Sequence, residues 1–154
     1  MLQEALVSTP STRSRYAIGA TTNEVAERFR IDRQTVPKVF GSALAYQGGT
    51  GNPAYWSRSM ICDLLSAWNG RTVAYPSSPL MTLEQVRGML LLAGYDVSRE
   101  AIAWAAQKPR TTLYKGAYRQ ASPPLEVVKV GWVVRVTHDA ALDFLERWKA
   151  YAAK

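Results

Sequence analysis

Several side chains with hydrogen-bonding ends follow one another closely in the first half of the chain: Arg33, Gln34, Thr35 and Lys38. If they lie on a helix that buries its apolar residues, all four face outward. Arginine can form a paired hydrogen bond with guanine and glutamine with adenine, whereas Lys38 and the nearby Arg30 are suited to phosphate contact. The group is typical of side chains that contact a DNA groove. The alternative is that Arg33 and Gln34 only solvate a helix face.

A weaker set of the same kind stands in the second half. Arg99 occupies the corresponding position, but Glu100 follows it, and a carboxylate near phosphates is unfavourable unless it accepts from a cytosine amine. Residues 108–119 hold four basic residues, two tyrosines and no acidic residue, so this run is the best phosphate-binding candidate of the second half. The alternative is a strand edge that its charges protect from aggregation. The basic residues of the run are Lys108, Arg110, Lys115 and Arg119.

Two further residues stand at expected helix starts. Arg58 follows a serine cap, where a basic side chain can contact phosphate. His138 aligns with Arg58 in a repeat described below, although a plain exposed histidine is the simpler interpretation. We expect the five tryptophans to pack in the core rather than to stack on bases, because Trp68 and Trp148 end apolar helical stripes at equivalent positions.

The composition favours an anionic partner. The 154 residues include 19 Lys and Arg against 12 Asp and Glu, a net charge of +7, and 47% of them are apolar, enough for a real core. Eight basic and five acidic residues precede Leu80, and eleven and seven follow it, so the halves carry +3 and +4. Basic charge can also serve solubility alone. We therefore expect nucleic acid as the partner but do not rest the expectation on charge.

The sequence contains few residues of the types that most often carry catalysis or bind metal ions. The single cysteine, Cys62, excludes an internal disulfide and a multi-cysteine zinc site. The single histidine makes a histidine-rich metal centre or a Ser-His-Asp triad improbable. A carboxylate-only site is not excluded by such counts. We expect no cofactor, no metal, no small-molecule substrate and no enzymatic activity. The polar N-terminus and the lack of a long apolar run predict a cytoplasmic protein without a membrane partner.

The elements that must position the first group are two short helices. Thr21 and Glu24 have the spacing of a capping box and begin the first helix. Asp32 is expected to cap a second helix over residues 33–40, in which Pro37 indicates an irregular first turn. Two short helices joined by a turn of three to four residues form a helix-turn-helix arrangement.

A hairpin and a third helix follow. Residues 43–46 and 53–56 flank a glycine-rich tip at 47–52, which predicts a β-hairpin. Ser57 then caps an apolar-striped helix over residues 58–68. The order is helix, turn, helix, hairpin, helix.

The second half repeats this order, with insertions confined to loops. A second hairpin is expected to pair residues 111–119 with 126–136 around a tip at 121–124. The matches are Thr82 and Gln85 at an offset of 61, residues 98–102 at an offset of 66, and residues 143–148 at an offset of 80. The expected organisation is a flexible N-terminus at 1–16, a first domain at 17–70, a linker at 71–80 and a second domain at 81–154.

The motifs Thr21-Thr-Asn-Glu24-Val-Ala26 and Asp32-Arg-Gln-Thr35-Val36 resemble the excisionase and MerR-type winged helix-turn-helix proteins. The resemblance is good over residues 20–40 and fair to Trp68, and it reaches the second half through the repeat. It implies an α+β fold of two tandem winged helix-turn-helix domains. It also implies a second helix in the major groove and a wing on the backbone or the minor groove.

The expected function is sequence-specific binding of double-stranded DNA. The resemblance implies a phage or mobile-element type transcription regulator or a recombination directionality factor. The alternative is a DNA-binding adaptor whose second winged helix binds protein or dimerises. Further candidate partners are a second copy of the chain and a recombinase or transcription protein.

Overall fold

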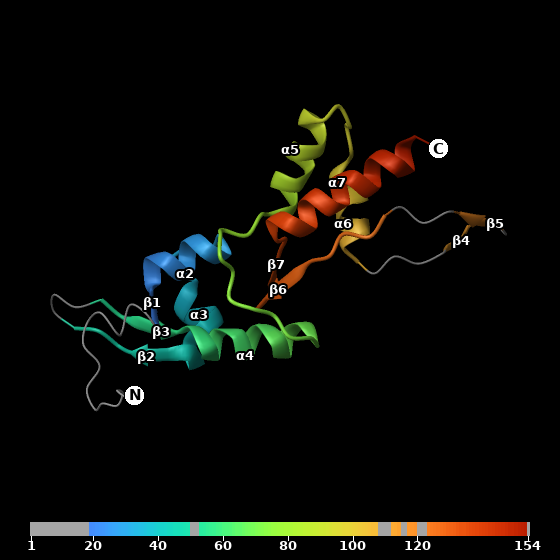
Figure 1. Ribbon diagram of the computed structural model, residues 1–154. Helices are drawn as coiled ribbons and strands as arrows, with labels where there is room; N and C mark the ends of the chain where they lie inside the picture. The colour runs from blue at the N-terminus through green and yellow to red at the C-terminus, as the bar shows by residue number, and fades with distance from the viewer. Residues whose placement is uncertain (1–18, 50–52, 108–111, 115–116, 120–122, 154) are drawn as a thin grey trace, which may run out of the picture. The chain divides into compact units, whose positions relative to one another are not determined.

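The computed structural model describes residues 19–49, 53–107, 112–114, 117–119 and 123–153 (Figure 1). The described residues form an α+β protein with six α-helices and small antiparallel sheets, which confirms the expected α+β class. The chain divides into two compact units, Met1–Ser77 and Ser78–Lys154. The N-terminus at 1–16, expected to be flexible, lies outside the described residues.

Unit 1 is a three-stranded sheet with three helices. The sheet has the order β1-β3-β2, so the last of the three strands in sequence lies in the middle, and Ala20 of β1 is paired with Trp56 of β3. Phe29, Phe40 and Ile61, one from each helix, are fully buried. The elements are β1 (Gly19–Thr21), α2 (Thr22–Phe29), α3 (Val36–Phe40), a 3-10 turn (Gly41–Ala43), β2 (Leu44–Tyr46), β3 (Tyr55–Ser57) and α4 (Arg58–Asn69).

Helix α3 begins later than the sequence predicts. The chain makes a turn in which the Thr35 N–H donates to the Asp32 carbonyl over 2.9 Å, and the helix starts only at Val36. Thr35 rather than Asp32 is the N-cap, and no side chain caps the helix, so the prediction for Asp32 was wrong. Pro37 explains the late start, because proline lacks an N–H and is accommodated only in the first turn of a helix.

The expected linker begins as part of unit 1. Val73 is buried, and its N–H donates to the Ser66 hydroxyl over 2.9 Å. The Tyr75 ring meets the Phe29 ring edge-on at 5.7 Å. Arg28 of α2 then donates to the Pro76 carbonyl over 2.7 Å. The chain therefore stays packed on unit 1 as far as Pro76.

After Pro76, the next residue bound by backbone hydrogen bonds to a compact unit is Met81. Its backbone exchanges hydrogen bonds of 2.7 and 2.8 Å with that of Val136 in unit 2. Residues 77–80 separate these two attachments. Five peptide units from Pro76 to Met81 span at most about 18 Å when fully extended. The connection between the units is thus much shorter than the ten residues that the sequence suggests.

Unit 2 has its own core, to which each of its helices contributes. Val86 and Leu90 of α5, Ile102 of α6 and Phe144 of α7 are buried in one cluster with Leu125. The elements are α5 (Leu83–Leu92), α6 (Arg99–Ala106), β4 (Thr112–Tyr114), β5 (Ala117–Arg119), β6 (Val128–Val130), β7 (Val133–Arg135) and α7 (His138–Ala152).

The strand pairing predicted for unit 2 was wrong. Strand β4 pairs with β5, and β6 pairs with β7, so the segments expected to pair with each other instead contribute to two separate strand pairs. Gly131 lies between the paired Val130 and Val133 with a φ of 62°, and with Trp132 it makes a two-residue turn. A left-handed glycine closes such a turn with little strain. The insertion in unit 2 is therefore a hairpin placed between α6 and β6.

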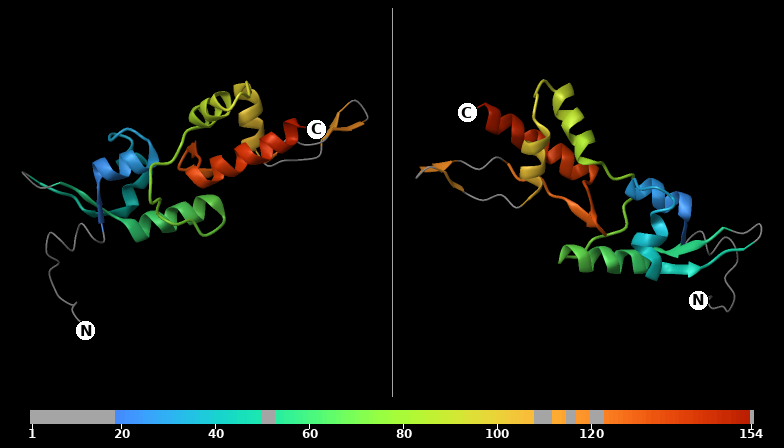
Figure 2. Two further views of the ribbon diagram at one scale, coloured as in Figure 1. Left: turned by 45° about the horizontal axis from the view of Figure 1, so that its top comes forward. Right: turned by 180° about the vertical axis from the view of Figure 1, so that it is seen from behind.

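Both units nevertheless share one order of elements, which can be followed by colour in Figure 2. The pair Ala20 and Trp56 in unit 1 corresponds to the pair Met81 and Val136 in unit 2, at the same offsets of 61 and 80 that the sequence shows. Each unit runs from a short extended segment through two helices and a hairpin, whose return pairs with that first segment, into a long helix.

Candidate nucleic-acid interface

The turn between α2 and α3 presents Arg30 at the end of α2. Arg30 is exposed and left-handed, with a φ of 54°, and its N–H donates to the carbonyls of Ala26 and Glu27. A non-glycine residue in this region costs roughly 1 kcal/mol. The backbone bonds that end α2 hold Arg30 in this conformation.

The predicted base-contacting residues, which begin three positions after Arg30, reach solvent. Arg33 and Gln34 are exposed in the turn, Lys38 is exposed on α3, and Thr35 is half-buried at the helix start. Asp32 is also exposed and is the one carboxylate between residues 30 and 40. The segment therefore keeps an excess of positive charge and hydrogen-bonding side chains on its outer side.

The inner side of the same segment is apolar and fixes its position. Val36 and Phe40 are fully buried and Val39 nearly so. The Phe40 ring lies 4.9 Å from that of Phe29 on α2 and 5.7 Å from that of Trp68 on α4. The outward side chains therefore lie on a turn and a short helix whose position is fixed by contacts with two other helices.

The hairpin of unit 1 adds little to such a surface. Residues 44–57 contain no charged residue, and the tip at 50–52 lies outside the described residues. Tyr46 is exposed, with its ring 5.9 Å from that of Tyr55. Contacts from this hairpin to a phosphate backbone would be uncharged.

Arg58, predicted to contact DNA, is engaged within unit 1. Its guanidinium donates to both carboxylate oxygens of Glu24, over 2.8 and 3.0 Å, and lies 5.2 Å from the centre of the Tyr75 ring. The Tyr75 hydroxyl donates to the same carboxylate over 3.0 Å. Glu24 thus neutralises Arg58 and joins α2, α4 and the exit segment. It does not turn back to Thr21, so only the Thr21 half of the predicted capping box forms.

Tyr75 is a structural residue that the sequence does not identify. Burial, and next the hydrogen bond to Glu24, raise the pKa of its hydroxyl above the usual value for tyrosine. Its contact with Glu24 bridges 51 positions of sequence, so no local spacing could indicate it. Tyr75 fixes the path of the chain as it leaves unit 1.

The outer face of α6 differs from that of α3. Arg99 forms an ion pair with Glu84 of α5 at 3.0 Å, and Glu100 is exposed beside it. Trp104 is 59% exposed in the middle of the helix, so the expectation of core packing was wrong for it. The helix that corresponds to α3 thus presents a paired arginine, a carboxylate and an indole.

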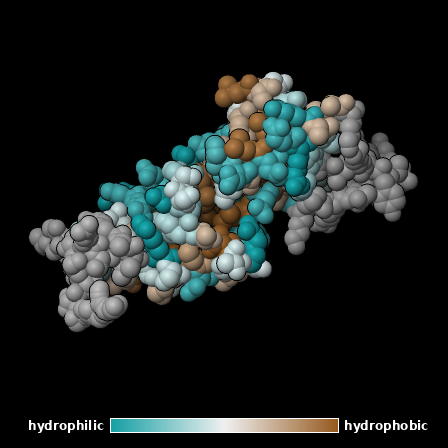
Figure 3. Space-filling model, in the orientation of Figure 1, coloured by the Kyte–Doolittle hydropathy of each residue, from teal (hydrophilic) through white to brown (hydrophobic). Residues whose placement is uncertain are grey.

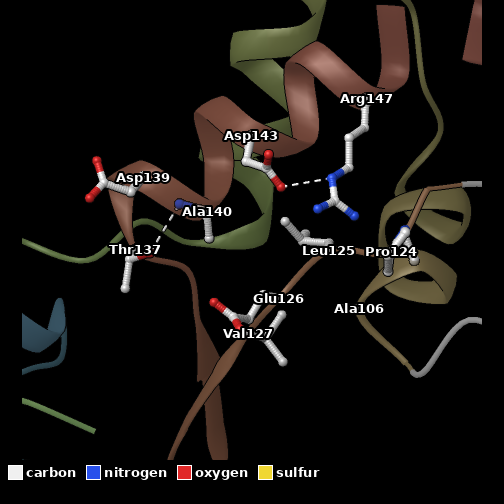
Figure 4. Close-up of a pocket in the computed structure, with 11 residues that line it drawn as sticks. Ala106, Pro124, Leu125, Glu126, Val127, Thr137, Asp139, Ala140, Asp143 and Arg147 are labelled. Carbon is white, nitrogen blue, oxygen red and sulfur yellow. Dashed lines mark hydrogen bonds and ion pairs between the residues drawn. The ribbon is translucent and has the colours of Figure 1, made fainter. Parts of the chain in front are cut away.

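A groove of about 840 Å³ lies on unit 2 between α6, residues 124–127 and α7 (Figure 4). Its charged side chains are Glu126, Asp139, Asp143 and Arg147, and Arg147 pairs with Asp143 at 2.9 Å. Carboxylates therefore outnumber cations along the groove. This face of unit 2 would repel a phosphate backbone.

The positive charge of unit 2 is concentrated in one segment. The described side chains of unit 2 include six basic and seven acidic residues. Lys108, Arg110 and Lys115 lie outside the described residues, and Arg119 is described only through the backbone of β5, where it is paired with Thr112. The structure therefore does not place the four predicted contacts of this run together at a surface.

The hairpin β6–β7 contains a second tryptophan for which the expected core packing was wrong. Trp132 is 66% exposed at the turn, and Lys129 is exposed on β6. A tryptophan beside the glycine of a two-residue turn is a signal that the sequence carries, because side chains at such tips point away from the strands. His138, at the start of α7, is exposed as expected.

No family model, no curated protein and no solved structure matches the chain. In the ranges that the structure describes, His, Cys, Asp and Glu nowhere gather in groups of three that could hold a metal ion. Every helix in the described part of the chain is too short or too polar to cross a lipid bilayer.

Proposed function

We propose that the protein binds double-stranded DNA with sequence preference, through two tandem winged helix-turn-helix units of the excisionase-like type. The observation that carries the proposal is the outward group of unit 1. Arg33, Gln34 and Lys38 face solvent on a segment whose other side is buried, and Arg30 stands at its start. Arginine and glutamine would contact base edges, and Arg30 and Lys38 phosphates.

The order of elements in the two units supports the same proposal. In each unit the second helix is followed by a hairpin, the arrangement in which a helix enters the major groove and the hairpin lies over the backbone. Such a protein would act in the cytoplasm as a transcription regulator or as a recombination directionality factor of a phage or mobile element.

The test is selection of sites from a random duplex library, followed by affinity measurements over a range of salt. Arg33→Ala and Gln34→Ala are expected to relax the preference at single positions, because each removes a contact worth about 1–3 kcal/mol of base discrimination. The matched control is Arg71→Ala, which removes an exposed arginine elsewhere in unit 1 and is expected to leave the preference unchanged. Absence of salt-sensitive duplex binding would contradict the proposal.

A second candidate function is supported by the outer face of α6. The Arg99–Glu84 ion pair, Glu100 and the exposed Trp104 suit contact with protein better than contact with phosphate. In this adaptor, unit 1 binds DNA and α6 of unit 2 binds a protein. Arg99→Ala and Trp104→Ala distinguish the candidates, because they leave the selected DNA site and the affinity unchanged if α6 does not contact DNA.

A further inference from the structure

The hairpin β6–β7 ends in a large exposed aromatic side chain on a short, well-defined turn. Trp132 follows the left-handed Gly131, and the flanking Val130 and Val133 are paired. With 66% of its surface exposed, the Trp132 side chain presents a large apolar face to solvent at this tip. Because the turn has only two residues, little backbone freedom is lost when the tip is immobilised against a partner.

The charges around Trp132 are favourable for an anionic partner. Residues 127–138 contain no carboxylate and include two cations, Lys129 and Arg135, whereas Glu126 and Asp139 stand directly outside this range. Lys129 is exposed on β6, and Arg135 is half-buried on β7 with one N–H donated to the Val134 carbonyl. This hairpin therefore contrasts with α6 and with the groove of unit 2, where exposed carboxylates are present.

The other strongly exposed apolar side chains of unit 2 have different surroundings. Leu92 is 92% exposed at the end of α5, where hydrophobic atoms protrude in Figure 3, and Trp104 stands four residues after the exposed Glu100. Neither combines a rigid tip with a basic neighbourhood. Leu92 is therefore a suitable control for the effect of removing exposed apolar surface alone.

We propose that Trp132 enters the minor groove of duplex DNA as a wedge between two base pairs, with Lys129 against a neighbouring phosphate. Apolar side chains that wedge between base steps do so from the minor groove, unstack the step and kink the duplex. The inference rests on the proposed DNA binding and extends it. Unit 1 selects the sequence through α3, and the β6–β7 hairpin of unit 2 deforms the duplex.

The experiment uses the full chain and its selected duplex, labelled at both ends for energy transfer and with 2-aminopurine at successive positions. The wild-type chain is expected to shorten the end-to-end distance and to raise 2-aminopurine fluorescence at one step. Trp132→Ala is expected to lose both signals and about ten-fold or more in affinity, the scale of one base–aromatic contact. The salt dependence is expected to stay the same, because no charge is removed.

Three matched variants separate the contributions. Trp132→Phe is expected to retain the kink, since an aromatic wedge remains. Leu92→Ala is expected to behave like the wild type. Lys129→Ala is expected to keep the kink and to reduce the salt slope by about one.

The outcomes distinguish this inference from the proposed function. If the wild-type chain shows no salt-sensitive duplex binding, the proposed function fails first. If it binds, but Trp132→Ala retains affinity and kink, the wedge is wrong while the DNA binding stands. If Trp132→Ala changes only the sedimentation of the chain, Trp132 belongs to a protein contact and the inference is overturned. Circular dichroism and thermal melting of each variant establish that the comparison is between folded proteins.

Discussion

Arg33 and Arg58 are both arginines of unit 1, yet their surroundings give them different roles. Arg33 is exposed in the turn before α3, whereas Arg58 is half-buried, paired with Glu24 and stacked over Tyr75. The Arg58 Nε atom is buried and without a hydrogen-bond partner, so this guanidinium is already partly removed from water. In the sequence both arginines directly follow an expected helix cap, Asp32 or Ser57, so the sequence does not distinguish them. Only the tertiary contacts separate a residue that can reach a ligand from one that holds the fold.

Arg58→Gln is expected to lower the free energy of unfolding of unit 1 by about 1–2 kcal/mol, because it leaves the half-buried Glu24 carboxylate without its cation. The salt dependence of DNA binding is expected to be unchanged. Lys38→Gln, at an exposed proposed phosphate contact, is the contrasting variant, with unchanged stability and a salt slope reduced by about one. Denaturant unfolding and salt-dependent polarisation measure the two quantities. A smaller salt slope for Arg58→Gln would show that Arg58 does contact phosphate.

The raised pKa of Tyr75 predicts a loss of stability at alkaline pH. An unfolded tyrosine ionises near pH 10, whereas the folded Tyr75 keeps its proton to higher pH. Its contribution to stability is therefore fully present below about pH 10 and declines as the pH rises beyond that value. Tyr75→Phe is expected to lose the hydrogen bond to Glu24, at a cost of about 1–2 kcal/mol near neutral pH, and to weaken the alkaline decline. Thermal melts of both proteins between pH 8 and 11 measure the difference.

At the scale of the elements, the local signals in the sequence predicted most helix starts correctly. Except at Asp32, each expected cap accepts a hydrogen bond from a backbone N–H three residues later, as capping requires. These interactions involve residues close in sequence, so their spacing is sufficient to indicate them. The confirmed caps are Thr21, Ser57, Thr82, Ser98 and Thr137.

Strand pairing in unit 2 could not be obtained in the same way. The valine-rich run from 127 to 136 has high strand propensity throughout, and propensity does not show where a strand turns back on itself. Gly131 marks that position through its left-handed conformation. Once β6 and β7 pair with each other, residues 112–119 must find a different partner, and they pair internally. The error came from a competition between two pairings that the sequence permits.

In the candidate site, too, features set by neighbouring residues could be predicted from the sequence, whereas features set by distant contacts could not. Exposure of Arg33, Gln34 and Lys38 follows from the apolar positions between them, so it could be predicted. The engagement of Arg58 and the role of Tyr75 depend on contacts 34 and 51 residues apart in sequence, which no spacing rule reaches.

The complete capping box of α5 offers a test of one local element. The Thr82 hydroxyl accepts from the Gln85 N–H over 3.1 Å, and the Gln85 side chain accepts from the Thr82 N–H over 2.9 Å. Thr82→Ala is expected to destabilise unit 2 by about 1 kcal/mol, and Thr82→Ser by much less because it keeps the hydroxyl. Hydrogen exchange of α5 and α7 amides, compared with those of α4, measures the effect. Equal loss of protection in α4 would contradict a local role.

At the scale of the whole molecule, the two units carry the same order of elements and different surfaces. The outer side of the turn and α3 in unit 1 is basic and polar, whereas α6 of unit 2 presents a paired arginine and a carboxylate. The sequence repeat indicated the common order. It did not indicate the divergence of the surfaces, because the Glu84 partner of Arg99 lies on another helix.

If both units bind DNA as proposed, the short connection requires them to contact neighbouring parts of one site. Inserting a flexible Gly/Ser segment of about ten residues between Ser77 and Ser78 lowers the effective concentration of one unit near the other. The full selected site is then expected to be bound more weakly, with unchanged melting of each unit. Polarisation with the full site and with the part contacted by unit 1 measures the effect. Unchanged affinity for the full site would show that unit 2 makes no DNA contact and would favour the adaptor.

Because Pro76 is attached to Arg28 and Met81 to Val136, the short connection would limit the spacing between the parts of a DNA site in the proposed complex. Adding five base pairs between the parts bound by the two units moves one part by roughly 17 Å and turns it by about half a helical turn. A connection that spans at most about 18 Å cannot follow both changes around the duplex. If both units bind DNA as proposed, selected sites should therefore have one fixed spacing, and insertions between the two parts should weaken binding more than single base changes.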